Sequence, residues 1–358
     1  MQLGHVSSRK DRLLKISVTV PCRIDLAGGT LDVYPLYLFE NGGLTVNAAI
    51  DVLGRVVVED REDAEIHIRS LDDDNAEAFS DLDEMEKHMG GELDLAKKAL
   101  RFYCRADGYP LPRRGMNISL SAEAPRGSGL GTSSALLMAL SCALNELGQL
   151  GLTRERIIDL GANIEAQVIS IPTGKQDYFP PLFGGICSTW FGVDGHATER
   201  LDAGNNLVEL LNQRLVLSFT NITRFSGITN WAMLKRYIEG EGETPTHMQR
   251  IKDVAVAMRQ SLLDRDLDEF AHLLSVEWEN RKALAEGVST PEIDGMMAAA
   301  SAAGARASKL CGAGGGGCMI TCAEPEHIPR VAKALQEAGA TLMPFQILKS
   351  GLQMEVSA

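Results

Sequence analysis

The sequence predicts a two-domain protein of mixed α and β structure. Its 358 residues exceed the usual size of a single domain. Segments rich in Val and Ile, with partial period-two alternation, interleave with helical segments along the whole chain. The polar residues 194–206, which include Asp194-Gly195 and Asn205-Asn206, make the clearest break. We therefore expect an N-terminal domain over residues 1–205 and a C-terminal domain over residues 206–358.

The first half of the chain carries the longer predicted strands. Alternation of Val and Ile with polar residues places them at residues 15–25, 43–60 and 114–122, with a weak strand around Ile66 and Ile68 and another that ends at Phe191. Predicted helices cover residues 94–107, 135–147 and 153–170. The hydroxyl of Thr153 can cap the last of these helices.

The second half carries most of the predicted helices. Helical periodicity places them near residues 226–240, 246–264, 266–286, 291–303 and 326–338. Strands are predicted at residues 214–219, 318–322, 343–348 and 353–356. Pro291 falls in the first turn of its helix, where the missing N–H has no intrahelical partner to lose.

The negative charge is concentrated in one stretch. The formal net charge is −13, from 35 basic and 48 acidic residues, and residues 59–94 alone hold 15 acidic and 3 basic residues, a local charge of −12. This acidity argues against nucleic acid or an anionic membrane as a partner. We expect the stretch to form a solvated edge away from the functional motifs.

Cysteine usage and hydropathy indicate a cytoplasmic protein. The seven cysteines form no CxxC pair, and several lie in apolar runs, as expected for reduced, buried thiols. Residues 15–20 alternate like a strand and unlike the apolar centre of a signal peptide. No apolar run approaches the ~18 residues of a membrane span. We expect no membrane partner, and a monomer or a homodimer.

A glycine cluster precedes the helix predicted from residue 135. In Gly127-Ser-Gly-Leu-Gly-Thr-Ser-Ser134, alternate glycines let backbone N–H groups converge on an anion. The helix N-terminus adds partial positive charge, and the hydroxyls can reach phosphate oxygens or Mg²⁺. The common P-loop pattern GxxxxGK[ST] is absent from the sequence. Alone, the cluster fits either a phosphate loop or a turn capped by Ser and Thr.

Three further motifs carry candidate chemistry. Lys309-Leu-Cys-Gly-Ala-Gly-Gly-Gly-Gly-Cys318 has five glycines in six positions, which is costly in chain entropy unless the loop lies against a ligand or the first loop. In residues 21–32 a predicted strand is followed by Gly-Gly-Thr. This turn would place Arg23 and Asp32 near one site. Glu165 and Asp177 lie twelve residues apart, and each alone would read as an ordinary surface acid.

Taken in this order, the four motifs resemble the GHMP kinase superfamily of galactokinase, homoserine kinase, mevalonate kinase and phosphomevalonate kinase. Residues 125–135 resemble its nucleotide motif, 309–318 its C-terminal glycine motif and 21–32 its substrate motif. The resemblance covers roughly residues 15–348. It implies an α+β GHMP kinase fold, with an N-terminal ribosomal-protein-S5-like α/β domain that binds ATP and a C-terminal ferredoxin-like α+β domain.

The resemblance also implies a reaction and its residues. ATP would donate its γ-phosphoryl group to a sugar hydroxyl, with Mg²⁺ held by Ser133 and Glu165. Asp177 would accept or orient the attacking hydroxyl, with Arg23 beside it. The substrate would contact Gly29, Thr30 and Asp32, and Lys175 and Arg224, with Arg126, are candidates for an anionic group on it. The nucleotide-binding residues would be Pro125, Arg126, Gly127, Ser128, Gly129, Leu130, Gly131, Thr132, Ser133, Ser134, Gly314, Gly315 and Gly316.

Within the superfamily, the sequence is most similar to the D-glycero-D-manno-heptose 7-phosphate kinases. Shared features include Gly174-Lys-Gln-Asp177 and Ser289-Thr-Pro-Glu-Ile-Asp294. Those enzymes usually read Gly-Gly-Gly-Thr-Asp where this chain has Gly28-Gly-Thr-Leu-Asp32. The resemblance favours a small-molecule sugar or sugar phosphate, phosphorylated at C1. The alternatives are a galactokinase-, fucokinase- or mevalonate kinase-like enzyme and, as a different class, a non-catalytic sugar and nucleotide sensor.

Overall fold

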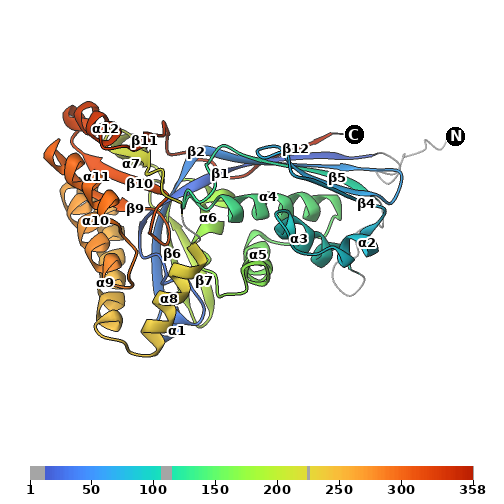
Figure 1. Ribbon diagram of the computed structural model, residues 1–358, viewed down its shortest axis with the longest axis horizontal. Coiled ribbons are helices and arrows are strands. Elements are labelled where there is room, and N and C mark those ends of the chain that lie inside the picture. The colour runs from blue at the N-terminus through green and yellow to red at the C-terminus, as the bar shows by residue number, and fades with distance from the viewer. Residues whose placement is uncertain (1–12, 106–114, 224–225, 358) are drawn as a thin grey trace.

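The structure of the protein is a computed structural model that describes residues 13–105, 115–223 and 226–357. Within these ranges the strands form two sheets, each with helices packed against it (Figure 1). The larger sheet has eight strands, in the order β12-β1-β2-β5-β3-β4, with β6 paired to β2 and β7 to β6. The smaller sheet has the order β11-β8-β10-β9. The mixed α and β fold expected from the sequence is confirmed.

The larger sheet is antiparallel except where β3 runs parallel to β5. Its central strand β2 is long enough to pair with β5 along one half and with β6 along the other. Burial alternates in the first part of β1 and the second part of β2, whereas the rest of each strand is buried on both faces. The strands are β1 (Lys15–Ala27), β2 (Gly43–Asp60), β3 (Ile66–Ser70), β4 (Ala76–Phe79), β5 (Met116–Ala122), β6 (Ile186–Gly192), β7 (Gly195–Arg200) and β12 (Gln353–Ser357).

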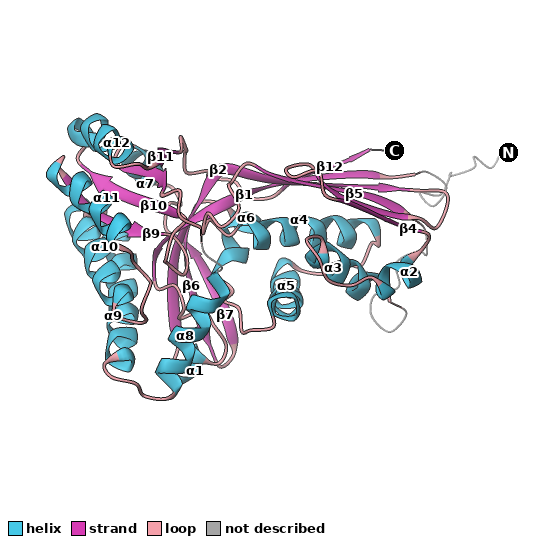
Figure 2. Cartoon of the chain, viewed as in Figure 1, coloured by secondary structure: helices cyan, strands magenta, loops and turns pink. Residues whose placement is uncertain are grey.

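Helices cover one face of the larger sheet (Figure 2). Among them, α4 packs on β1 and β2 and buries ten of its residues. Thr153 accepts a hydrogen bond from the Arg156 N–H at 3.2 Å and so caps α5 as predicted. The helices of this half are α1 (Leu36–Phe39), α2 (Leu82–Lys87), α3 (Asp94–Cys104), α4 (Thr132–Leu147), α5 (Arg154–Ile169) and α6 (Phe179–Phe183), with a 3₁₀ turn, η2 (Gln176–Tyr178).

The smaller sheet is antiparallel throughout and carries helices on its outer side (Figure 1). Helices α10 and α11 pack on β9, and α12 packs on β8. The strands are β8 (Leu215–Phe219), β9 (Ala305–Leu310), β10 (Cys318–Ala323) and β11 (Thr341–Leu342). The helices are α7 (Leu207–Asn212), α8 (Ser226–Ile238), α9 (Thr244–Asp264), α10 (Leu267–Lys282), α11 (Pro291–Ala302) and α12 (Ile328–Glu337), with a 3₁₀ turn, η3 (Pro325–His327).

Local structure differs from the sequence expectation in several places, among them the short elements β4 and α7 and the three strand segments that follow. Strand β7 forms inside the polar stretch 194–206 and pairs with β6. Strand β9 was not expected, because its small and charged residues lack strand alternation. Residues 343–348 contribute one bridge, between Ile347 and Ile50, and no extended strand. The strands of the smaller sheet all follow residue 206, while β12 returns to the larger sheet; a division at residues 205 and 206 remains a prediction.

Two further expectations concern thiols and membranes. All seven cysteines are free, and all except the partly exposed Cys104 are buried, as the sequence indicated. In the described ranges, each helix is too short or too polar to span a bilayer.

Candidate active site

Two cavities meet at the first glycine loop, residues 127–134. The larger has a volume of about 590 Å³ and lies between β5, α3 and α4. The smaller, of about 270 Å³, is lined by residues from β1, the end of α5 and the glycine loops. Gly127, Thr132 and Ser133 line both cavities. A ligand could therefore extend from one cavity into the other across this loop.

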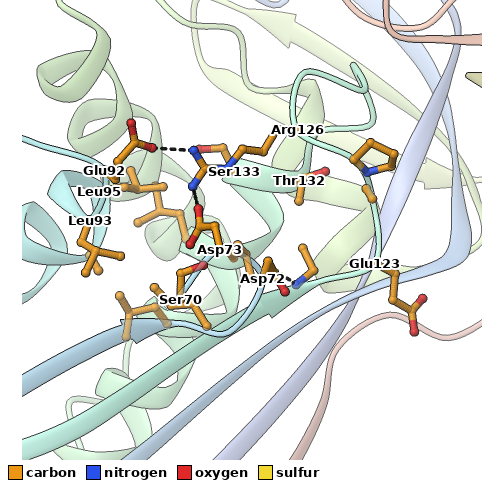
Figure 3. Close-up of a pocket in the computed structure, with 18 of the residues that line it drawn as sticks. Ser70, Asp72, Asp73, Glu92, Leu93, Leu95, Glu123, Arg126, Thr132 and Ser133 are labelled. Atoms are coloured by element: carbon orange, nitrogen blue, oxygen red, sulfur yellow. Dashed lines mark hydrogen bonds and ion pairs between the residues drawn. The ribbon is translucent and has the colours of Figure 1, made fainter. Parts of the chain in front are cut away.

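The larger cavity combines apolar walls with a charged rim (Figure 3). Leucine side chains from the start of α3 and from α4 supply much of the apolar surface. At the rim, the guanidinium of Arg126 lies between the carboxylates of Asp73 and Glu92 and pairs with both. Asp72 accepts a hydrogen bond from the backbone N–H of Ala122, which fixes the turn after β3 against β5. The cavity has the apolar character expected of a small-molecule site.

The sequence led us to expect the acidic stretch 59–94 to lie away from the functional motifs. The structure shows instead that part of it lies beside them. Asp72, Asp73 and Glu92 line the larger cavity, and the last two contact Arg126, which directly precedes the first glycine loop. The expectation was wrong because β3 pairs with β5, which leads directly into that loop. Residues that are far apart in the sequence are thus brought into contact by strand pairing.

The first glycine loop adopts a conformation that requires glycine. Gly127, Gly129 and Gly131 all have φ near +70°, in the left-handed region. A Cβ on Gly129 would lie 2.6 Å from the carbonyl oxygen of Cys311. The two glycine loops pack together, since the Cys318 N–H donates to the carbonyl oxygen of Ser128 at 2.6 Å. This close approach accounts for Gly129 in the first loop and for Gly312 and Gly317 in the second.

Arg23 and Asp177 form an ion pair at the floor of the smaller cavity. The Arg23 side chain contacts Asp177 Oδ1 through Nε at 2.8 Å and donates to the carbonyl oxygen of Gly129 at 2.5 Å. The pairing of β1 with β2 shifts register on either side of Arg23. Burial alone would lower the pKa of Arg23, but Asp177 and Asp25 raise it above its ordinary value. Arg23 therefore stays charged and holds Asp177 against the glycine loop.

Asp32 is a buried carboxylate of the same cavity. Its Oδ2 accepts a hydrogen bond from the Gln176 N–H at 2.8 Å, while its Oδ1 has no hydrogen-bond partner. Burial raises its pKa to about 6. Gly174 leaves room for this carboxylate, because a Cβ there would lie 2.0 Å from Oδ2. An unpartnered buried acceptor in a cavity indicates a place for a ligand donor.

Glu165 lies beside the start of α4. Its carboxylate accepts hydrogen bonds from Ser134 Oγ at 2.9 Å and from the hydroxyl of Tyr178. Burial raises the pKa of Glu165 above its ordinary value, although these two hydroxyls oppose the shift. Ser133 is exposed and lines both cavities. Among the described residues, no group of three or more His, Cys, Asp or Glu side chains could hold a metal ion by itself.

The structure gathers some of the other predicted site residues and separates others. Thr30 lines the smaller cavity, and the carbonyl of Gly29 faces α10. Lys175 pairs with Asp159 at 2.6 Å, and Arg126 belongs to the rim of the larger cavity. Gly314 and Gly316 pack against Val288 and Ile222, with Gly315 between them. Arg224 lies outside the described residues.

Sequence reasoning missed several residues of the smaller cavity, and three of them carry amide or guanidinium side chains. Gln176, Asn230 and Arg281 line it, and none of them lies in a glycine motif. Arg281 could have been noticed, because it follows Glu277 by one helical turn on a segment with apolar neighbours. A charged pair on such a face has to meet polar groups elsewhere in the fold.

Comparison with known proteins identifies the class. Residues 94–185 match the GHMP kinases N terminal domain, and residues 258–341 match the GHMP kinases C terminal domain. The D-glycero-alpha-D-manno-heptose 7-phosphate kinase of Campylobacter jejuni is 29% identical over 94% of this chain and 98% of that protein. The mevalonate kinase of Pyrococcus abyssi is also 29% identical, over 95% and 98%. A crystal structure of a D-glycero-D-manno-heptose 1-phosphate kinase from Bacteroides thetaiotaomicron matches with a TM-score of 0.75 and 27% identity, over 95% of this chain and 98% of that one.

The fold and the matched domains thus define an ATP-dependent phosphotransferase. The chain belongs to the GHMP kinases and carries both the N-terminal and the C-terminal domain of that family. The α+β GHMP kinase fold expected from the motifs is confirmed.

Proposed function

We propose that this kinase transfers the γ-phosphoryl group of ATP to a hydroxyl of a sugar or sugar phosphate, with the C1 hydroxyl of a heptose 7-phosphate as the favoured acceptor. One observation carries the proposal. The larger and smaller cavities meet at Gly127, Thr132 and Ser133, and Asp177 lines the smaller cavity beside Gly131 of the same loop. A donor and an acceptor can therefore approach each other across the glycine loop, as direct transfer requires.

The nucleotide is assigned to the larger cavity and the glycine loop. A purine ring would occupy the apolar space between α3 and α4, and the triphosphate would follow residues 127–134 toward the smaller cavity. The N-terminus of α4 and the N–H groups of the glycine loop would offer positive potential to the phosphates. This arrangement explains how an acidic protein can hold a polyphosphate without a basic surface. In this proposal residues 1–205 form the ATP-binding domain.

Mg²⁺ is assigned to Glu165 and Ser133, and the donor set fits this ion. A buried carboxylate and nearby hydroxyls are hard oxygen donors, and Mg²⁺ in kinases typically uses one or two carboxylates together with substrate phosphates. Such a site needs no all-protein cluster, in keeping with the described residues. When bound, the ion neutralises charge on the transferring phosphate. Ser134 and Tyr178 orient the Glu165 carboxylate through their hydroxyls.

Asp177 and Arg23 are assigned to the transfer step. Phosphoryl transfer depends on positioning and on charge stabilisation more than on covalent help from the protein. The Asp177 carboxylate is fixed by Arg23 and partly exposed to the cavity, so it can accept or orient the proton of an attacking hydroxyl. The Arg23 guanidinium, held to Gly129 as well, offsets negative charge where the loop meets the acceptor.

Asp32 favours an acceptor rich in hydroxyl groups. Its unpartnered Oδ1 can accept a hydrogen bond from a sugar hydroxyl, which would satisfy a buried acceptor. Thr30 and Asn230 add neutral polar groups to the same cavity. The heptose kinase relatives support a heptose acceptor, whereas the mevalonate kinase relative of equal identity makes mevalonate the alternative.

Acceptor-dependent ADP release tests the proposal. The purified protein would be supplied with ATP and Mg²⁺ and, in turn, with D-glycero-D-manno-heptose 7-phosphate, mannose, fucose, galactose and mevalonate. We expect turnover with the heptose phosphate at least about tenfold above that with the other acceptors. Phosphorylation of mevalonate alone would overturn the sugar assignment, and binding of sugar and nucleotide without ADP release would indicate a sensor. NMR of the product would identify the phosphorylated hydroxyl.

A further inference from the structure

Four fully buried charges lie side by side where α10 and β9 meet β1. Lys309 Nζ lies 2.9 Å from Asp25 Oδ1 and 3.5 Å from Glu277 Oε2. Arg281 NH2 lies 2.6 Å from Glu277 Oε1, and the side chains of this pair are 1% and 0% exposed. The four charges cancel, but removing them from water is costly, and apolar side chains of similar size often serve stability as well. The cluster therefore calls for a role other than stability.

The cluster reaches two parts of the candidate site. Arg281 NH2 donates to the carbonyl oxygen of Gly29 at 2.9 Å, and NH1 lies 3.5 Å from Thr30 Oγ1. On the other side, the Gly312 N–H donates to Asp25 Oδ2 at 3.3 Å. Side chains of α10 and β9 are thus connected both to residues 28–32, which we name the acceptor turn, and to the second glycine loop, residues 312–317.

The acceptor turn needs such a support. Thr30 has φ +76°, a left-handed conformation that is unfavourable for a β-branched residue. The turn ends at Asp32, whose carboxylate lies in the smaller cavity. Gly29 has no room for a side chain, because a Cβ there would lie 2.9 Å from Arg281 NH2 and 3.0 Å from Gln176 Nε2. Arg281 therefore occupies the space next to the turn and bonds to it.

We infer that Arg281 is a positioning residue that holds the acceptor turn in its strained conformation, so that Asp32 faces the acceptor. The inference deepens the proposed function and rests on it for the identity of the acceptor site. The Arg281 guanidinium donates to Glu277 through Nε and NH2, and this pairing fixes its orientation. In that orientation NH2 also donates to Gly29 and NH1 is directed at Thr30. Lysine could not replace this planar fork, since it offers a point charge without fixed directions.

The charge state of Arg281 supports this role. Burial alone would lower its pKa, but Glu277 and Asp25 raise it above the ordinary value. The guanidinium therefore remains a donor across the whole range of working pH. Its contact with the turn does not depend on a titration.

A double variant separates positioning from stability. Arg281→Met/Glu277→Leu replaces the pair by apolar side chains of similar volume and leaves Lys309 paired with Asp25, so the fold should be kept. The matched control is Arg306→Met/Asp268→Asn. That pair also joins β9 to α10 but lies near the opposite end of the helix, and it is partly exposed.

Two readouts decide the inference. Hydrogen exchange of the ligand-free protein follows the Leu31 and Val33 amides, which bond to the carbonyls of Gly28 and Thr30 within the turn. We expect exchange in residues 28–33 to rise about tenfold in the double variant and to stay unchanged in the control. With the heptose phosphate, KM for the acceptor should rise about 10- to 100-fold while KM for ATP changes by less than about twofold.

The outcomes are distinct. Wild-type exchange in the turn of a folded double variant, or an equal rise of both KM values, would overturn the inference. If the double variant fails to fold, Arg281→Lys takes its place. In that variant, hydrogen exchange in residues 28–33 and KM for the acceptor should both rise, by smaller factors than in the double variant. If the wild-type protein releases no ADP with any acceptor, the proposed function has failed. The exchange experiment on the ligand-free protein then still decides the role of Arg281.

Discussion

The two cavities that meet at the glycine loop are built from different groups. The larger is walled by leucines of α3 and α4, with charges only at its rim. The smaller is built around fixed charges: Arg23 with Asp177, Arg281 with Glu277 behind it, and Asp32, whose Oδ1 has no hydrogen-bond partner. Apolar walls tolerate changes of similar volume, whereas a displaced polar group can abolish turnover. Substitutions in the smaller cavity should therefore affect activity far more than those in the larger.

The largest effect is expected for Asp177→Asn. The amide is nearly isosteric but can no longer take a proton from the acceptor, so kcat should fall by about 10²- to 10⁴-fold. Loss of the Arg23 ion pair should cost little nucleotide affinity. Steady-state kinetics and calorimetry of ATP binding measure the two effects separately. Turnover within a few-fold of wild type, with both ligands still bound, would remove Asp177 from the transfer step.

Gly174→Ala should come next, because its Cβ would lie 2.0 Å from Asp32 Oδ2. Asp32 must then leave its hydrogen bond to the Gln176 N–H, and kcat/KM for the acceptor should fall by about 10²-fold. Gly295→Ala is the matched control: it lies in α11 with open space around it and should stabilise the protein by about 0.5–1 kcal/mol. Unchanged acceptor kinetics in Gly174→Ala would show that the Asp32 position is not critical.

A pH effect of intermediate size is expected from Asp32. Its pKa is raised to about 6 by burial, with Asp177 and Asp25 adding negative charge nearby. The ionised form accepts hydroxyl donors, so kcat/KM for the acceptor should fall about tenfold per pH unit well below pH 6. The effect on stability has the opposite sign. The folded state binds this proton more tightly than the unfolded chain, so this group adds stability as the pH falls from 6 toward 4.

The matching experiment compares the wild type with Asp32→Asn at saturating ATP and Mg²⁺. The variant should have lower activity, and its kcat/KM for the acceptor should fall less steeply with decreasing pH than that of the wild type. If the fall in kcat/KM at low pH is the same in the variant, another group is responsible for it. Glu165 would be the first to examine, because burial also raises its pKa.

The smallest effect is expected at the rim of the larger cavity. Arg126→Gln removes two ion pairs, but the Arg126 side chain is 66% exposed, so unfolding free energy should change by less than about 1 kcal/mol. KM for ATP should change only a few-fold, because the apolar walls remain. Lys349→Gln, which removes an exposed pair with Glu209, controls for surface charge. A loss of ATP binding above about 100-fold would mean that Arg126 holds the phosphates directly.

The resemblance of short motifs to those of the GHMP kinases predicted much of the candidate site. Arg23 lies in the motif that contains Asp32, and Glu165 and Asp177 keep the twelve-residue step of that family, so these residues could be picked out from the local sequence. Arg281 and Glu92 carry no local signal of this kind. Each reaches the site from another element, and the contacts that bring them there are made only by sheet pairing and helix packing. Strand β9 was missed because tertiary pairing with β10 overrides its weak propensity.

The return of β12 to the larger sheet has a consequence for folding kinetics. Strand β1 pairs with β12 from Lys15 to Thr19, and the Ser357 hydroxyl approaches the Lys15 carbonyl across 342 residues of sequence. Contacts of such long range form slowly, because closing so long a loop costs chain entropy before the contact can stabilise the fold. Until then β1 has an open edge that could pair with another chain. A variant that ends at residue 352 and so lacks β12 should therefore aggregate more during refolding. The two cavities, which β12 does not line, keep all their lining residues.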